Sequence, residues 1–156
     1  MPALTIDEMN QLIRDGVPLV GAMGVTVESL GDGTIRLQLP YRTDFVRPGG
    51  TVMGPALFAL ADVALYGAVL SLIGRVELAV TTSMTINFLR RPAPRAIEAE
   101  GRVLKLGKRL AYGEVTLWSA GEDEPVAHAT GTYSIPPHPP VPVPASHYVA
   151  PAGEKV

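Results

Sequence analysis

The sequence predicts a single α+β domain in which a curved antiparallel sheet wraps around one long central helix. Three observations support this prediction: a run at 55–73 that is apolar on every side, strand-like segments before and after it, and glycine-containing turns between those segments. A helix without a polar face must be buried on all sides. A sheet can bury such a helix only by curling around it. The length of 156 residues suits one domain with a substantial core.

Composition excludes several classes of function. Hydrophobic residues make up 47% of the chain, charged residues make up 18%, and the formal net charge is -2, so neither a disordered chain nor a general nucleic-acid binder is expected. The absence of cysteine excludes disulfides, thiolate metal sites and a cysteine nucleophile. The three histidines lack a metal-ligand spacing, and no nucleotide-binding loop precedes a helix. The first residues have no signal-peptide pattern, so we expect a cytoplasmic location.

The elements before the long helix are a short helix, a hairpin and a loop. Thr5 and Glu8 form the pattern of a capping box at a helix start, and Gly16 can end that helix. The next two segments alternate apolar and polar residues, as strands with one buried face do, and the Gly-Asp-Gly sequence between them suits a turn. The helix is expected over 5–15, the strands over 24–30 and 34–40, and the loop over 41–54.

The long helix itself is expected over 55–73. Pro55 suits its first turn, where a missing N–H costs nothing, and Gly74 suits its end. The length nearly matches that of a membrane span, but Asp62 lies near the centre, where a bilayer would make a carboxylate costly. The alternating strands on both sides also favour a globular domain, so a membrane is not expected as a partner.

Four strand-like segments follow the long helix. In the first of them, Val80, Met84, Ile86 and Phe88 are expected on one face and Thr81 on the opposite face. Gly-Lys and a short acidic stretch supply turns between the later segments. The four segments cover 78–89, 96–106, 109–119 and 125–135.

The chain divides into one domain over 1–136, which includes the short N-terminal helix, and a proline-rich tail over 137–156. Seven of the fifteen prolines lie at or after position 136, and this density favours an extended arm over a packed element. His138 and His147 fall in this region and are not expected to have a function.

Asp62 is the most informative residue for chemistry, because it is the only charged side chain of the long helix. A carboxylate among apolar neighbours is costly unless it is paired, hydrogen-bonded or open to solvent. Acids in such surroundings are enriched at catalytic sites. The structural alternative is a carboxylate that bonds to neighbouring backbone or pairs across a subunit interface.

Two further features can bind a substrate. Gly49, Gly50 and Gly54 lie just before the long helix, where unpaired N–H groups carry partial positive charge and can hold an oxyanion; the alternative is an ordinary glycine-rich loop. Seven of the thirteen Lys and Arg residues fall within 90–109, where they can grip phosphates or simply be solvated strand ends. These seven are Arg90, Arg91, Arg95, Arg102, Lys105, Lys108 and Arg109.

These segments resemble the hotdog-fold acyl-CoA thioesterases, in the group related to the phenylacetate-degradation (PaaI-like) thioesterase. The resemblance covers roughly 15–136 and is strongest around the start of the long helix. Its motifs are the glycine-containing segment 47–55, the run Leu60-Ala61-Asp62-Val63-Ala64, the strand 81–92 and the hairpin 107–111.

The resemblance implies a hotdog fold and a homodimer whose sheets join edge to edge, or a homotetramer, with active sites between protomers. It implies that Asp62 acts as nucleophile or general base on the thioester of an acyl-CoA. It further implies that the Gly54 N–H polarises the thioester carbonyl and that Thr81 helps to orient water. No cofactor is expected apart from the coenzyme A of the substrate, and no metal.

The same resemblance assigns binding roles to two sets of residues. Arg47, Met53, Pro55, Phe58 and Tyr66 are expected to bind substrate, with Leu57 as a further apolar neighbour. Arg90, Arg91, Lys108 and Arg109 are expected to hold the CoA phosphates.

Three positions depart from the family pattern. Met53 replaces the motif histidine, Pro55 replaces the second motif glycine, and Arg47 replaces an Asn or Gln. These replacements leave open a catalytically weak or inactive hotdog protein that binds acyl-CoA or a related ligand. A hotdog hydratase is a third possibility, in which His128, expected on the surface of the last strand, would approach Asp62 in space.

Overall fold

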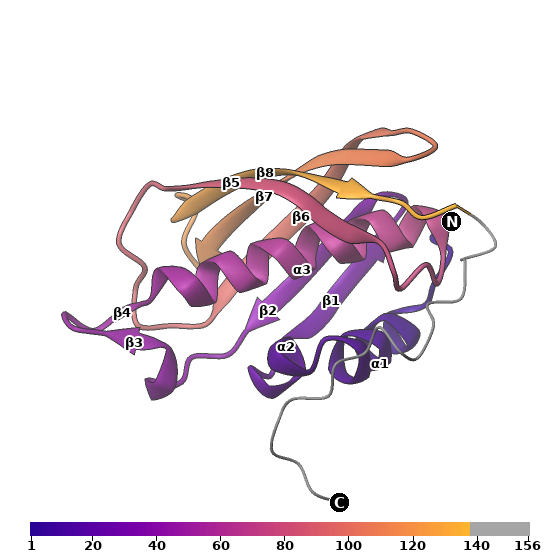
Figure 1. Ribbon diagram of the computed structural model, residues 1–156. Coiled ribbons are helices and arrows are strands. Elements are labelled where there is room, and N and C mark those ends of the chain that lie inside the picture. Colours follow the sequence, from indigo (N-terminus) through magenta and orange to yellow (C-terminus); the bar gives the residue numbers. More distant parts are fainter. Residues whose placement is uncertain (138–156) are drawn as a thin grey trace, which may run out of the picture.

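The computed structural model describes residues 1–137 and has one long helix, α3 (Gly54–Ile73), in the hollow of a six-stranded antiparallel sheet (Figure 1). This arrangement confirms the predicted fold class. The strands follow the order β1-β2-β6-β7-β8-β5, so β1 and β5 form the two edges. Every strand lies within two residues of its expected bounds: β1 (Thr26–Gly31), β2 (Thr34–Leu39), β5 (Val80–Phe88), β6 (Ile97–Leu106), β7 (Leu110–Ser119) and β8 (Ala127–Ser134). His138, His147 and the expected tail beyond residue 137 lie outside the described residues.

Helix α3 begins one residue earlier than expected, with Gly54 at its first position and Pro55 at its second. Gly74 ends the helix with a positive φ of 79°, a conformation that glycine adopts without steric cost. The helix is long and apolar enough to cross a membrane, but two thirds of its most apolar stretch is buried inside the domain. Most of its apolar surface is therefore buried inside the domain.

Three glycines on the inner face of the sheet let α3 lie close to it. A Cβ on Gly101 of β6 would lie 2.7 Å from the carbonyl oxygen of Ala64. A Cβ on Gly113 of β7 or on Gly131 of β8 would lie 2.5 or 2.9 Å from the side chain of Leu65. Side chains at these positions would push the helix outward, so the glycines set the distance between the two layers.

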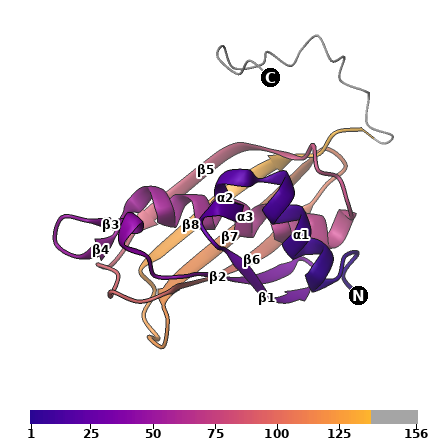
Figure 2. The ribbon, with the colours of Figure 1, turned by 90° about the horizontal axis from the view of Figure 1, so that it is seen from below.

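The N-terminal segment covers the side of α3 that the sheet leaves open (Figures 1 and 2). The capping box of α1 (Ile6–Gly16) is confirmed: Thr5 Oγ1 accepts from the Glu8 N–H at 3.2 Å, and the Glu8 carboxylate accepts from the Thr5 N–H at 2.8 Å. A second helix, α2 (Pro18–Ala22), was not predicted. Its five residues are too few for a helical period to show in the sequence.

The segment expected as a loop at 41–54 contains short regular elements. It includes a 3-10 turn, η1 (Thr43–Phe45), and a two-stranded hairpin made of β3 (Val46–Arg47) and β4 (Thr51–Val52). Gly49 and Gly50 turn this hairpin with φ angles of 98° and 79°. These two glycines therefore form the turn of a hairpin, which matches the alternative of an ordinary glycine-rich loop.

The expected faces of β5 are wrong at its start. A β-bulge between Thr81 and Ser83 interrupts the alternation, so Thr81 pairs with the inward-facing Tyr133 of β8. Val80 therefore does not share the face of Met84 and Ile86, which pack against the core, and it is 58% exposed. A bulge adds one residue to one strand only, and nothing in a regular alternation of residue types shows where it falls.

Replacing Gly101 by Ala is expected to lower the free energy of unfolding by about 1–3 kcal/mol, because the new methyl group meets helix backbone that cannot move aside. Urea unfolding measures the change. Gly16→Ala is the matched control: a Cβ there meets nothing within 4 Å, so stability stays equal or rises by up to about 1 kcal/mol. Equal stability of the Gly101 variant and the parent would contradict this account of the close packing.

Candidate active site

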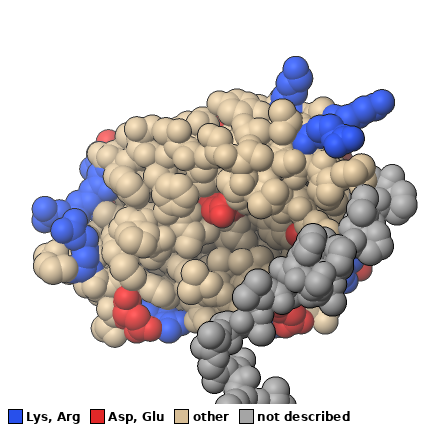
Figure 3. Space-filling view, in the orientation of Figure 1, with Lys and Arg blue, Asp and Glu red and all other residues tan. Residues whose placement is uncertain are grey.

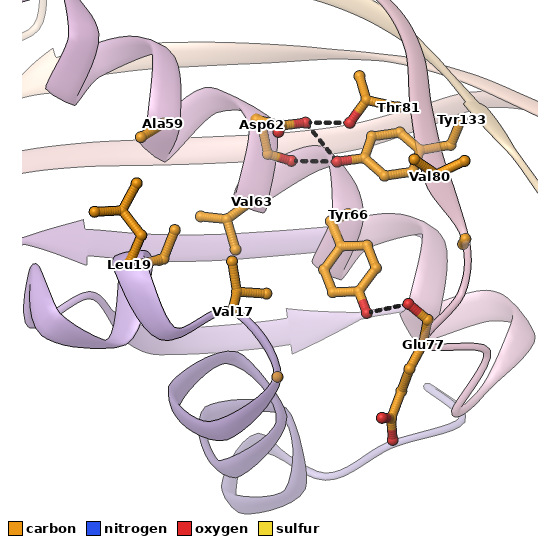
Figure 4. A pocket seen from close by; sticks show the side chains of 13 residues that line it. Val17, Leu19, Ala59, Asp62, Val63, Tyr66, Glu77, Val80, Thr81 and Tyr133 are labelled. Carbon is orange, nitrogen blue, oxygen red and sulfur yellow. Dashed lines mark hydrogen bonds between the residues drawn. The ribbon is translucent and has the colours of Figure 1, made fainter. Parts of the chain in front are cut away.

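Asp62 lies at one end of a cavity of about 310 Å³ between α3, the α1–α2 segment and the start of β5 (Figure 4). Its side chain is partly buried and accepts two hydrogen bonds on one oxygen, Oδ1. Thr81 Oγ1–H donates at 2.7 Å, and the Tyr133 hydroxyl donates at 2.5 Å. The Tyr133 hydroxyl also lies 3.0 Å from the main-chain oxygen of Asp62. The costly carboxylate expected from the sequence is therefore stabilised by two hydroxyl groups.

The two donors meet because they are neighbours across the sheet. Thr81 on β5 and Tyr133 on β8 are paired in register, and the β5 bulge turns Thr81 to the inner face. Tyr133 follows the small inward residues Ala129 and Gly131 along β8, so its large ring reaches the helix only at this level. The Thr81 hydroxyl, expected to orient water, is engaged by the carboxylate itself.

Tyr133 was missed in the sequence because it reads as an ordinary inward residue of an alternating strand. The usable signal is chemical: a phenol on a buried face usually needs a hydrogen-bond partner. Here only 3% of the residue is exposed, and Asp62 is the partner.

Tyr66 lies beside Tyr133, with the ring centroids 5.9 Å apart. Its hydroxyl donates to the main-chain oxygen of Glu77 at 3.1 Å. Burial, with a smaller effect of the Glu77 charge, raises the pKa of the Tyr66 hydroxyl to about 12. Burial first, and then the Asp62 charge, raise the pKa of Tyr133 well above its ordinary value. Both phenols are therefore protonated donors at neutral pH.

Most of the other residues that line this cavity are apolar. Within residues 1–137 its charged lining residues are Asp62 and Glu77, and the Glu77 carboxylate faces Arg75 at 2.9 Å. Figure 4 places Leu19 and Ala59 on the side of the cavity opposite Tyr66 and Glu77. Such a lining suits an uncharged apolar group whose polar end faces Asp62. The apolar lining side chains are those of Val17, Leu19, Val20, Ala59, Val63, Ala79 and Val80.

A second cavity, of about 510 Å³, lies at the start of α3. As the first residue of the helix, Gly54 has an N–H without a helical partner. A Cβ on Gly54 would lie 3.3 Å from the end of the Phe88 ring, so this ring marks where β5 passes the helix start. The cavity also contains three predicted binding residues: Arg47, Arg90 and Arg91, beside Leu57.

The predicted catalytic pair is therefore divided between two cavities of one chain. Gly54 and Asp62 are eight residues apart on a single helix, which places them about 12 Å apart along its axis. One thioester carbonyl cannot contact both groups in the same chain. Tyr66 and Thr81 join Asp62 in the first cavity, and Arg47 joins Gly54 in the second.

The remaining predicted residues lie elsewhere. Met53 packs against the core beside the helix start, Pro55 is exposed, and Phe58 is 38% exposed outside both cavities. Lys108 and Arg109 occupy the β6–β7 turn.

The basic cluster at 90–109 is also divided. Arg90 and Arg91 follow the end of β5, whereas Arg109 lies beside the end of β8, next to the start of β5. A nine-residue strand, about 30 Å long, separates the two groups. Basic side chains accordingly appear at two separate ends of the face shown in Figure 3.

His128 lies on the opposite face of the sheet from Asp62. Its ring is 3.1 Å from the Glu114 carboxylate, which also pairs with Arg102. The Arg102 and His128 hydrogen bonds, in that order, lower the pKa of Glu114. A catalytic pair of His128 with Asp62, as a hydratase would need, is thus absent from the part of the chain that the structure describes.

Comparison with known proteins points to one family. The model of the "Thioesterase superfamily" matches residues 49–126. The chain is 30% identical over 134 residues to the "Putative esterase SSO1253" of Saccharolobus solfataricus, covering 86% of this chain and 87% of the relative.

Solved structures give the same result. A "putative thioesterase" from Silicibacter sp. TM1040 matches with a TM-score of 0.80 and 40% identity over 88% of this chain and 95% of its own. A mutant of the phenylacetic acid degradation protein PaaI from Thermus thermophilus matches with a TM-score of 0.67 and 30% identity, covering 76% of this chain and 98% of its own.

The two buried phenols predict a loss of stability at alkaline pH. The folded state holds their protons more tightly than the unfolded chain does. Their contribution is complete below about pH 10, where an exposed tyrosine is half ionised, and the Tyr66 contribution is lost as the pH rises toward its folded pKa of about 12. Urea unfolding between pH 9 and 11.5 should show this fall. Tyr66→Phe should flatten it by up to about 1 kcal/mol per pH unit near pH 11; an unchanged slope would contradict the assignment.

Proposed function

The chain belongs to the thioesterase superfamily, and on this basis we propose that it hydrolyses an acyl-CoA thioester to the free acid and CoA, working in the cytoplasm. The observation that supports this most directly is the Asp62 carboxylate. It is held on one oxygen by Thr81 and Tyr133 at the end of an apolar cavity. Within residues 1–137 no hydrogen bond reaches its other oxygen, Oδ2, which is therefore available for reaction.

We propose that the complete site forms between two copies of the chain. Strand β5 is an edge of the sheet, and within the described range it pairs only with β8. It also exposes Val80, Phe88 and the adjacent Leu89, each by more than half. Free strand edges are templates for pairing with another chain, and exposed apolar side chains favour association.

The geometry of β5 explains how a dimer would complete the site. Thr81, near one end of β5, contacts Asp62, and Phe88, at the other end, lies against Gly54. Antiparallel pairing of two β5 strands, centred on Met84 and Thr85, sets Thr81 opposite Phe88 of the partner subunit. This pairing brings Asp62 toward Gly54 of the partner subunit, so that one thioester contacts both.

The same pairing would bring the two separated parts of the basic cluster close together. Arg90 and Arg91 at the end of β5 would come near the partner's β6–β7 turn, which contains Lys108 and Arg109. Four basic side chains from two chains would then surround the mouth of each site, and Arg90 would have to exchange its ion pair with Glu124 for a phosphate. Such a cluster suits the phosphates of CoA, while the apolar cavity beside Asp62 would take an uncharged acyl group.

Two routes fit this arrangement. As general base, Asp62 takes a proton from water, and the water oxygen bonds to the carbonyl carbon. The carbonyl electron pair moves to oxygen, where the Gly54 N–H stabilises it. The carbon–sulfur bond then breaks as the carbonyl re-forms, and the proton on Asp62 passes to the departing sulfur.

As nucleophile, Asp62 would itself bond to the carbonyl carbon, expel the thiolate and form an anhydride. Water would then hydrolyse that anhydride. Both routes consume one water and release one acid and one thiol. Both also need a carboxylate oxygen that is not already held by a hydrogen bond. Within residues 1–137 no hydrogen bond reaches Oδ2.

An acyl-CoA-binding protein with little or no catalysis is the second candidate. The replacements at Met53 and Pro55 favour it, because they remove polar groups from the start of α3. The Gly54 N–H and the Asp62 carboxylate are both retained, however, and the hydrolytic scheme depends on these two groups.

Asp62→Asn is expected to reduce hydrolysis of acyl-CoA substrates by at least about 100-fold, because the amide can neither attack nor accept a proton. Release of CoA measured with a thiol reagent tests this directly, since the chain has no cysteine of its own. Asp123→Asn is the matched control, at an exposed turn position. Hydrolysis that survives in Asp62→Asn removes this carboxylate from the chemistry, and a wild type inactive on every acyl-CoA favours the binding protein.

Mixing two inactive variants tests the shared site. Gly54→Pro removes the proposed oxyanion donor at a helix position that tolerates proline, and Gly54→Ala, which keeps the N–H, is its control. Equal amounts of Asp62→Asn and Gly54→Pro, allowed to exchange subunits, should recover about a quarter of wild-type activity. Half of the dimers are then mixed, and each has one intact site of two. No recovery despite exchange would contradict a site made of Asp62 from one chain and Gly54 from the other.

A further inference from the structure

Two hydroxyl groups converge on the same oxygen of Asp62, and the reaction routes above assign a role to neither the Tyr133 phenol nor this convergence. The Tyr133 donor is 2.5 Å from Oδ1 and the Thr81 donor is 2.7 Å from it. Because an ionised carboxylate has two equivalent oxygens, bonds to one of them fix how the group is rotated. They leave Oδ2 to face the cavity.

The Tyr133 hydroxyl is itself held in a fixed place. The residue is buried, and its ring stands beside the ring of Tyr66. The hydroxyl lies within 3.0 Å of the main-chain oxygen of Asp62 as well as its Oδ1. One phenol therefore contacts both the backbone and the side chain of the same helical residue, which ties the carboxylate to the position of α3.

Tyr133 also remains a donor under working conditions. Burial and the nearby Asp62 charge raise its pKa above the ordinary value of a tyrosine, so the hydroxyl keeps its proton at neutral pH. Hydrogen bonds from hydroxyl groups to a carboxylate are short and stronger than bonds between neutral groups. The contact is thus a strong restraint on the orientation of the Asp62 carboxylate.

We propose that Tyr133 is a positioning residue for thioester hydrolysis: together with Thr81 it holds Asp62 so that Oδ2 is the oxygen that attacks the substrate or takes the proton from water. This inference rests on the proposed thioesterase function. Tyr133 does not touch the reacting atoms and acts through Asp62. Thr81 and Tyr133 share the task because the register of β5 and β8 places them side by side.

The test is Tyr133→Phe, which removes the hydroxyl and keeps the ring that packs beside Tyr66. We expect kcat to fall by about 10- to 100-fold, while KM changes by less than about twofold, because substrate contacts remain. Tyr112→Phe, an exposed phenol on the same sheet, is the matched control with unchanged kcat. The thermal midpoint of Tyr133→Phe, compared with that of wild type, shows whether the fold is intact.

Thr81→Val and the double variant complete the experiment. If both hydroxyl groups restrict one rotation, each single variant leaves one restraint, and the double variant loses more than the product of the two single losses. A folded Tyr133→Phe with wild-type kcat, or independent losses in the double variant, would overturn the positioning role. If Tyr133→Phe does not fold, the kcat of Thr81→Val decides: a wild-type value overturns the role. A wild type without hydrolysis overturns the proposed function and this inference together, an outcome distinct from an active enzyme insensitive to Tyr133.

Discussion

The burial of α3 is the constraint on which the rest of the structure depends. Thirteen of its twenty residues are buried, so the sheet must curve around the helix. Glycines on three neighbouring strands let the helix lie close to the sheet. The one charged residue of this helix is then held inside the concave surface. Asp62 needs donors that reach it from the sheet, and Thr81 and Tyr133 supply them. The packing of the helix therefore determines where chemistry can occur.

That packing also divides the site along the helix. Gly54, at the first turn, lies against Phe88 at the end of β5, and Asp62, two turns later, contacts Thr81 at the start of β5. Helix and strand thus run past each other in opposite senses. A twofold axis between two antiparallel β5 strands would set the start of each strand beside the end of the other. The same edge of the sheet would then serve both self-association and catalysis. On this view a dimer is needed for chemistry and not only for stability.

Much of the fold could be predicted because its determinants are local. The apolar run of α3, the alternation of the strands and the capping box at Thr5 each depend on residues close in sequence, and the structure confirms them. Asp62 could be singled out because a charge in an apolar helix is conspicuous. The β5 bulge and the pairing of Thr81 with Tyr133 depend on strand register, which residue types alone do not specify. The division of the basic cluster also depends on strand pairing, because Arg90 and Arg91 follow one end of β5 and Arg109 lies near the other end.

The polar groups of the site are unevenly distributed, and this bears on the replaced motif positions. At the start of α3, Met53 and Pro55 offer no polar side chain, so the polar side chains in the cavity beside Gly54 are those of Thr51 and three arginines, Arg47, Arg90 and Arg91. At the Asp62 end, two hydroxyl groups and a second phenol, Tyr66, surround the carboxylate. In the proposed mechanism, a Gly54 N–H without a motif histidine beside it can still serve as oxyanion donor when the attacking oxygen is rigidly aimed, because orientation and electrostatic stabilisation lower the same barrier. On that proposal, the restraint at Asp62 makes hydrolysis compatible with the replacement of the motif histidine by Met53.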